Sequence, residues 1–196
     1  MFVLILIIIA LLLIKKTNWF KGFVGEQKVR MLLYTLPAND YVKLHGVILP
    51  SGLASTEIDH LIFSQYGVFV IETKNKSGWI YGEKYDKEWT QTFPGGAKFK
   101  FQNPLHQNYK HTETLIELLG IDKDHAHSIV TFSSKAEFKT RVPNNVLTYK
   151  QLPNYIKSFH HKVFTKEEVQ IYTYIIEKKR HRGVFAKLQH IWSLHY

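Results

Sequence analysis

The stretch from Thr56 to Lys76, TEIDHLIFSQYGVFVIETKNK, constrains the fold of this chain more than any other. Two apolar segments flank a turn at Gln65-Tyr66-Gly67, which predicts two neighbouring strands joined by a tight loop. The second segment is apolar on both faces until its last residues, so we expect a buried strand near the centre of a sheet. Ligands of α/β proteins usually bind at the ends of such strands.

Charged residues gather where this strand ends. Side chains alternate between the two faces of a strand, so Glu72 and Lys74 project side by side. A loop at Gln65-Tyr66 places Asp59 opposite Glu72, whereas a loop at Tyr66-Gly67 places it opposite Lys74. Either register brings Asp59 within roughly 5 to 8 Å of the pair. Carboxylates that close repel one another unless a proton or a cation lies between them, and a hard divalent cation takes oxygen ligands. An ordinary ion-paired sheet edge fits the same residue types.

The charge balance restricts the partners of this chain. Its 196 residues carry a formal net charge of +10, which suggests a polyanionic partner, either nucleic acid or an anionic membrane face. The chain has no cysteine, and this excludes disulfides and thiolate metal sites. Its length suits one well-formed core, or one domain with appendages.

An uninterrupted apolar run, Met1 to Ile14, opens the chain and is followed by Lys15, Lys16 and Lys21. As a helix this run reaches roughly 21 Å, short of the ~30 Å hydrocarbon core of a bilayer. A signal-peptide core and a buried helix are the alternatives, but no basic side chain precedes the run and no small-residue cleavage site follows it. We therefore predict a single-pass membrane anchor over residues 1–20, with the rest of the chain in the cytoplasm.

The rest of the chain alternates predicted helices and strands. Residues 22–25 read as a linker, and 97–101, where lysine alternates with phenylalanine, as an amphipathic edge strand rather than a nucleic-acid surface. A capping box at Thr165 predicts a last helix that leads into the basic run Lys178 to Arg182, either a solvated helix end or a contact for anionic lipid or nucleic acid. Other helices are expected at Glu26 to Leu36, Pro104 to Leu119 and Gln151 to Phe159; other strands at Tyr41 to Leu49, Gly78 to Tyr81, Glu88 to Phe93, His125 to Phe132 and Val146 to Tyr149.

One arrangement of residues stands out as a functional pattern. A helix with Glu26 is followed by Asp59, by Glu72-Thr73-Lys74, and by a helix with Gln107, whereas HExxH and glycine-rich phosphate loops are absent. This order resembles the PD-(D/E)xK nucleases of the restriction-endonuclease-like superfamily, and more closely the nuclease-related domain, abbreviated NERD. The matching pieces are GEQKV from Gly25, EIDHLIFSQYGVFVIETKN from Glu57, GWIYG from Gly78 and NPLHQNYKH from Asn103.

The resemblance covers about Lys21 to Phe132, and the expected domains are therefore residues 1–20, 21–132 and a C-terminal extension, 133–196, with a basic helix. It implies an α/β fold of the restriction-endonuclease-like type, with a mixed central sheet flanked by helices, after the N-terminal transmembrane helix. One departure is Ile58, which stands where the superfamily has proline before the first aspartate. The chemistry is unaffected, because the carboxylate performs it.

The same resemblance implies roles for individual residues. Asp59, Glu72 and the Thr73 carbonyl would hold Mg²⁺, with Mn²⁺ as an alternative. Lys74 would orient or deprotonate the attacking water and offset the charge of the phosphorane. Glu26 would join the metal shell or polarise Lys74, and Gln107 would fix Lys74 or a phosphate oxygen.

The expected function is accordingly a membrane-anchored, metal-dependent nuclease that hydrolyses the phosphodiester bonds of nucleic acid, with DNA as the expected substrate. The alternative is a membrane-anchored module without turnover that binds nucleic acid or a protein partner. The presence of Asp59, Glu72 and Lys74 together favours the nuclease, because a module without turnover has no chemical need for all three.

Overall fold

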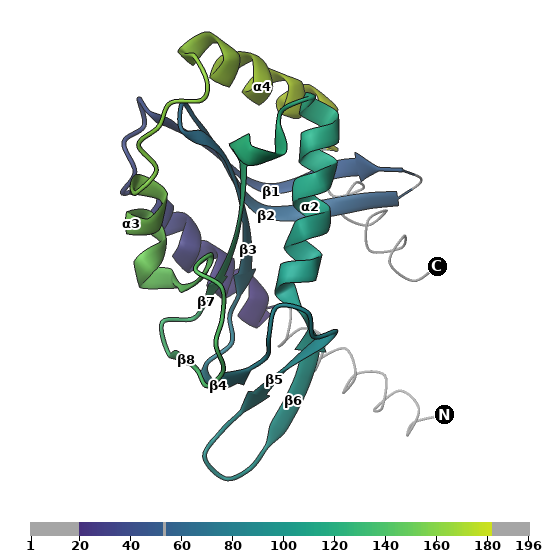
Figure 1. Ribbon diagram of the computed structural model, residues 1–196, viewed down its shortest axis with the longest axis vertical. Helices are drawn as coiled ribbons and strands as arrows, with labels where there is room; N and C mark the ends of the chain where they lie inside the picture. The colour runs from purple at the N-terminus through teal and green to yellow at the C-terminus, as the bar shows by residue number, and fades with distance from the viewer. Residues whose placement is uncertain (1–19, 53, 182–196) are drawn as a thin grey trace, which may run out of the picture.

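A computed structural model describes residues 20–52 and 54–181 of the chain (Figure 1). Its centre is a five-stranded mixed sheet in the order β1-β2-β3-β7-β9. The strands β1, β2 and β3 pair antiparallel, while β7 and β9 continue the sheet parallel to β3. Strand β3 is therefore the middle strand, and it is buried from Gly67 to Glu72, which confirms the prediction of a buried central strand. The bounds are β1 (Tyr41–Ser51), β2 (Ala54–Ser64), β3 (Gly67–Lys74), β7 (Ala126–Phe132) and β9 (Val146–Thr148).

The turn between β2 and β3 settles the register that the sequence left open. Ser64 pairs with Gly67, so the loop consists of Gln65 and Tyr66. Gly67 has a positive φ of 125°, and a Cβ atom there would lie 2.8 Å from the His125 carbonyl oxygen. Only glycine fits this corner of the chain. Because His60 pairs with Ile71, the next step of the same register sets Asp59 against Glu72.

A second, four-stranded sheet in the order β6-β5-β4-β8 lies at one end of the molecule (Figure 1). The sequence predicted its first three strands but not that they form a separate sheet, and it missed β8. Strand β6 is an edge strand, as the alternation of lysine and phenylalanine predicted. The bounds are β4 (Gly78–Tyr81), β5 (Glu88–Thr92), β6 (Lys98–Gln102) and β8 (Ala136–Phe138).

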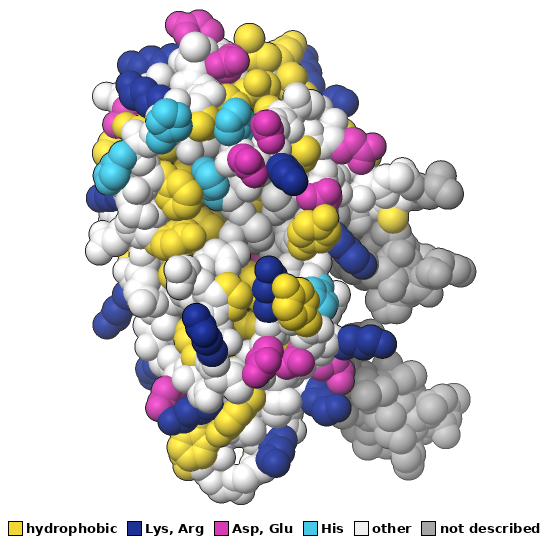
Figure 2. Space-filling model, in the orientation of Figure 1, with side chains coloured by type: hydrophobic (Ala, Val, Ile, Leu, Met, Phe, Trp, Pro, Cys, Tyr) yellow, Lys and Arg dark blue, Asp and Glu magenta, His cyan; other side chains and the backbone are white. Residues whose placement is uncertain are grey.

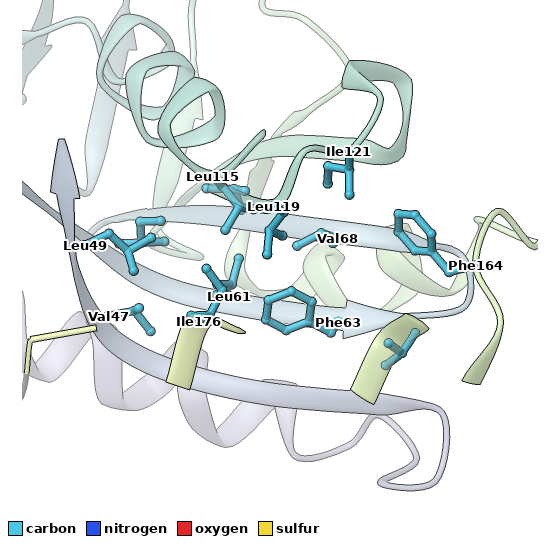
Figure 3. Packing of buried hydrophobic residues seen from close by; sticks show 13 residues of the cluster. Val47, Leu49, Leu61, Phe63, Val68, Leu115, Leu119, Ile121, Phe164 and Ile176 are labelled. Atoms are coloured by element: carbon cyan, nitrogen blue, oxygen red, sulfur yellow. The ribbon is translucent and has the colours of Figure 1, made fainter. Parts of the chain in front are cut away.

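Helices cover both faces of the central sheet. On one face, Leu115 and Leu119 of α2 join residues of β1, β2 and β3 and of α4 in one apolar cluster (Figure 3). On the other face, the N-terminal helix and α3 pack against Ile62, Phe69 and Ile71. The result is the helix–sheet–helix layering expected for an α/β fold. The helices are the N-terminal helix (residues 20–33), α2 (Pro104–Leu119), α3 (Leu152–Lys157) and α4 (Lys166–Lys179).

The N-terminal helix corrects two sequence predictions. Residues 22–25 are helical rather than a linker, and the helix ends at residue 33 instead of 36. Gly25 is buried, and a Cβ atom there would lie 2.5 Å from Asn75 Cβ and 2.9 Å from the Tyr149 hydroxyl. This glycine therefore serves close packing of the helix against the end of β3, and not chain flexibility.

The ends of α2 and α4 agree with their sequence signals. The Asn103 side chain accepts a hydrogen bond from the Leu105 amide, and Gly120 ends α2 in a left-handed conformation. At the start of α4, the Thr165 hydroxyl accepts from the Glu168 amide while the Glu168 carboxylate accepts from the Thr165 amide. Both helices therefore start, and α2 also stops, where capping chemistry predicts.

The described part of the chain beyond residue 132 contributes to the same cores. Strand β9 extends the central sheet, while α3 and α4 each cover one of its faces. Within residues 20–52 and 54–181, no helix is long and apolar enough to span a membrane. The predicted anchor run, Met1 to Ile14, and Arg182 of the basic run lie outside these ranges.

Candidate functional site

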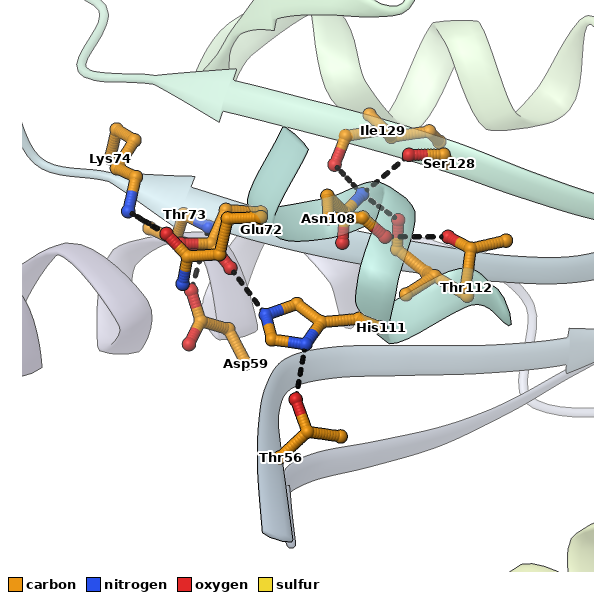
Figure 4. A network of polar contacts seen from close by, with 12 residues as sticks. Thr56, Asp59, Glu72, Thr73, Lys74, Asn108, His111, Thr112, Ser128 and Ile129 are labelled. Atoms are coloured by element: carbon orange, nitrogen blue, oxygen red, sulfur yellow. Dashed lines mark hydrogen bonds and ion pairs between the residues drawn. The ribbon is translucent and has the colours of Figure 1, made fainter. Parts of the chain in front are cut away.

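Asp59 and Glu72 lie at the end of the β2–β3 hairpin that is opposite its turn. One carboxylate oxygen of Asp59, Oδ2, accepts a hydrogen bond of 2.7 Å from the backbone amide of Thr73 (Figure 4). This bond fixes the half-buried Asp59 side chain against the neighbouring strand and satisfies a backbone amide at the strand end. Beyond the last backbone pair of β2 and β3, His60 with Ile71, this side-chain hydrogen bond therefore joins the two strands.

Glu72 is the most enclosed carboxylate of the site, with only 2% of its surface exposed. Its Oε1 lies 2.6 Å from the Lys74 ammonium, and its Oε2 lies 3.3 Å from His111 Nε2. On the other side of the His111 ring, Nδ1 lies 2.6 Å from the Thr56 hydroxyl. A chain of polar contacts therefore runs from β2 through α2 to Glu72 and Lys74 (Figure 4).

Helix α2 supplies the other half of the site. Gln107 Oε1 accepts a hydrogen bond of 2.8 Å from Lys74 Nζ, and His111 follows Gln107 one turn later. Between them, the buried amide nitrogen of Asn108 lies 2.9 Å from the Val70 carbonyl and 2.9 Å from the Ile129 carbonyl. Asn108 thus fastens α2 across β3 and β7 and holds Gln107 and His111 above the strand end.

The pKa values of the two carboxyl groups shift in opposite directions. Burial, followed by repulsion from Glu72 and Glu26, raises the pKa of Asp59 well above its usual value, although Thr73 and Lys74 oppose the shift. Burial also acts to raise the pKa of Glu72, but the charges and hydrogen bonds of Lys74 and His111 outweigh it and lower the pKa. Without a cation, the site therefore favours the ionisation of Glu72 over that of Asp59.

Two further residues take part in the electrostatics of the site. Glu26, on the N-terminal helix, adds to the negative field that acts on Asp59. Burial and then the carboxylates of Asp59 and Glu26 raise the pKa of Tyr149. The Tyr149 hydroxyl is buried, has no hydrogen-bond partner among the described residues, and lies against Gly25, the residue before Glu26.

The oxygen atoms of Asp59 and Glu72 suit a hard divalent cation, because two neighbouring carboxylates repel one another without one. Across residues 20–52 and 54–181, however, no group of three or more His, Asp or Glu side chains gathers to hold a metal. A cation at this site would therefore need backbone carbonyl oxygens or water to complete its shell, and the Thr73 carbonyl is the sequence-predicted one.

The structure brings most of the predicted residues together. Lys74 contacts both Glu72 and Gln107, and Asp59 is bonded to the backbone of Thr73. Glu26 acts on Asp59 through its charge. The residues that hold this group in place were not predicted from the sequence. Only His111 had a signal there, because it lies one helical turn after Gln107. The missed residues are Thr56, Asn108, His111 and Tyr149.

The sequence of the chain is similar to that of known proteins. A family model described as the nuclease-related domain, NERD, matches residues 21–133. An uncharacterized protein of Bacillus anthracis is similar to the chain, with 36% identity over 182 residues that cover 90% of this chain and 84% of the relative. No solved structure matches.

The raised pKa of Asp59 predicts how the stability of the protein depends on pH without metal. A carboxyl group whose pKa is raised by folding stabilises the folded state below its unfolded pKa, and this contribution is lost as pH rises through the raised value. In EDTA, the melting temperature of wild type should therefore fall relative to that of Asp59→Asn as the pH rises above the unfolded pKa of about 4. Melting curves at several pH values measure this, with Asp40→Asn, an exposed aspartate, as control. Parallel profiles for wild type and Asp59→Asn would show that Asp59 titrates normally.

Proposed function

The chain belongs to the nuclease-related domain (NERD) family, and on that premise we propose that it is a metal-dependent nuclease that hydrolyses phosphodiester bonds, with DNA as the expected substrate. The observation that carries the proposal is the meeting of Asp59, Glu72 and Lys74 at the end of the central strand. The same order of residues supports placement in the PD-(D/E)xK superfamily. The net charge of +10 suits a phosphate-rich substrate.

The proposed cofactor is Mg²⁺, with Mn²⁺ as the alternative, held by Asp59, Glu72 and the Thr73 carbonyl. The chemistry that such an ion supplies is Lewis-acid activation of a water and of a phosphate oxygen. The position of Asp59 beside Glu72 at the end of the central strand supports this assignment, and burial, followed by repulsion from Glu72 and Glu26, raises the pKa of Asp59.

Lys74 is the proposed electrophilic residue. Its ammonium, fixed between Glu72 and Gln107, would orient the attacking water and offset the negative charge that develops on the phosphorane. Gln107 keeps this side chain in one position. His111 does the same for Glu72, since it contacts the oxygen that Lys74 does not. Glu26 would join the metal shell or polarise Lys74.

A binding module without turnover is the second candidate. It is favoured by the occupied oxygens of Glu72, both of which already contact Lys74 or His111. Such a module would keep the ion-paired cluster for stability and bind nucleic acid or a protein partner through other surfaces. The two candidates differ in one measurable property, the cleavage of phosphodiesters.

We expect the purified full-length protein to cleave single- or double-stranded nucleic acid when Mg²⁺ or Mn²⁺ is present and to be inactive in EDTA. Asp59→Asn removes a proposed metal ligand and Lys74→Ala removes the proposed electrophile, so each should lower the cleavage rate roughly 100- to 1,000-fold. Gel assays with labelled DNA and RNA measure the rate.

Asp40→Asn and Lys123→Ala, which change exposed residues of the same types elsewhere, serve as controls and should cleave as wild type does. Clean wild-type protein that cleaves neither DNA nor RNA with any of these metals would favour the binding module. Equal rates for wild type and Asp59→Asn would contradict the assignment of the site.

We also propose that residues 1–20 anchor the protein in a membrane and that the nuclease-related domain lies in the cytoplasm. The support is the apolar run Met1 to Ile14 and the lysines that follow it. The full-length protein should sediment with membranes and resist extraction by high salt or carbonate, whereas a soluble protein would disprove the anchor. Protease added outside intact cells should leave the domain uncut, whereas digestion would show that the domain lies outside the cell.

A further inference from the structure

The outer face of the second sheet carries a groove that the proposed function does not use. It has a volume of about 650 Å³ and lies over β4, β5 and β6. Figure 2 shows hydrophobic side chains with lysines beside them at this end of the molecule, where β5 and β6 lie. The side chains that matter for its chemistry are Trp79, Tyr81, Thr90, Thr92, Lys98 and Lys100.

The register of the sheet arranges these side chains in two rows. Trp79 pairs with Thr92, which pairs with Lys98. In the next row, Tyr81 pairs with Thr90, which pairs with Lys100. Each row therefore runs from an aromatic ring on β4, across a hydroxyl group on β5, to an ammonium group on β6.

This face is separate from the core of the protein. Ile80 and Trp89, which alternate with the groove residues along β4 and β5, are fully buried and pack with Val130 and Phe132. Tyr81, in contrast, is 39% exposed although it is a large aromatic residue. Trp79 is half-buried, so the groove presents one half-buried and one exposed ring on a strand whose other face is fixed by packing.

Charge on the groove face is positive on balance. Lys100 pairs with Glu88 at 3.3 Å, and Lys139, whose ammonium lies 5.3 Å from the centre of the Trp79 ring, pairs with Glu137. Lys98 forms no ion pair within the described part of the chain and remains as a free positive charge. A ligand of this groove is therefore expected to combine flat apolar groups with negative charge.

The spacing of the rows fits a polynucleotide. Trp79 and Tyr81 are two residues apart on β4, so their side chains leave the strand about 7 Å from each other. Strand β6 lies two strands away, about 10 Å from β4 across the sheet. In a strand with stacked bases the phosphates advance about 3.4 Å per nucleotide, so the interval of about 7 Å between the two rings spans two nucleotides and leaves room for a base against each ring. Aromatic rings beside a positively charged edge are the usual means of binding single strands.

We propose that this groove binds single-stranded nucleic acid, with bases stacked on Trp79 and Tyr81 and phosphates on Lys98 and Lys100. The inference deepens the proposed function and rests on it, because the groove would hold the strand on which the Asp59–Glu72 site acts. Trp79 follows Lys74 by five residues, so their Cα atoms are at most roughly 18 Å apart. A duplex should bind more weakly, because its bases are stacked on one another.

The test measures binding separately from cleavage. Full-length protein in detergent and EDTA is titrated into a fluorescent 12-nucleotide thymidine strand, the same strand paired with its complement, and an abasic strand of equal length. Tyr81→Ala should weaken binding of the thymidine strand roughly 5- to 100-fold and leave the abasic strand unaffected, since only bases stack. Tyr81→Phe keeps the ring and should bind as wild type does.

The salt dependence of the binding affinity measures the contacts between lysines and phosphates. Lys98→Ala should lower the slope of log affinity against log salt by about 0.7, the value for one phosphate of a single strand. Matched controls are Tyr85→Ala, at an aromatic residue that is 82% exposed and outside the groove, and Lys123→Ala. Both should bind as wild type does.

The outcomes distinguish the groove from the catalytic proposal. If no nucleic acid is cleaved but thymidine binding still depends on Tyr81 and Lys98, the groove is supported and the nuclease is not. If cleavage occurs and Tyr81→Ala binds the thymidine strand as tightly as wild type, the groove proposal is overturned while the nuclease stands. Binding of a neutral oligosaccharide that depends on Tyr81, without binding of the thymidine strand, would also overturn it.

Discussion

A buried carboxylate determines the organisation of this molecule. Glu72 ends an apolar strand in the middle of the central sheet, and an ion in such a place destabilises the fold unless other charges and hydrogen bonds compensate it. Lys74 and His111 each contact one of its oxygens. Compensation by His111 requires α2 to lie across the sheet, and Asn108 holds it there. The position of α2 on the sheet therefore determines both the packing of the core and the contacts of Glu72.

Much of the site followed from local sequence signals. Alternation along β3 placed Glu72 and Lys74 on one face, and the buried run before them identified the central strand. The choice between two registers could not be made from the hydrophobic pattern, because it depends on the corner at Gly67, where a side chain would meet the carbonyl group of His125, just before β7, and the His127 ring. A contact so far along the chain leaves no periodic signal in the sequence.

The errors have the same origin. The strands of the second sheet were predicted but not their assembly, because runs this short do not reveal their partners. Gly25 was interpreted as part of a linker, whereas its packing against Asn75 and Tyr149 depends on residues far away in the sequence. Tyr149 itself lies beyond the residues that the family model matches, yet its hydroxyl is buried beside the site. The described segment after residue 133 is thus part of the environment of Asp59 and Glu26.

The central claim is that Asp59 and Glu72 form a metal pair rather than an ordinary ion cluster, and melting curves with EDTA or Mg²⁺ test it most directly. Wild type should be stabilised by Mg²⁺, by about 2.7 kcal/mol when the ion is present at 100 times its dissociation constant. Asp59→Asn should melt at the same or a higher temperature in EDTA and no longer respond to Mg²⁺, because it removes one repelling charge and one ligand. Lys74→Ala should be less stable in EDTA and still respond. A wild-type melting temperature that neither Mg²⁺ nor Mn²⁺ changes would contradict the claim.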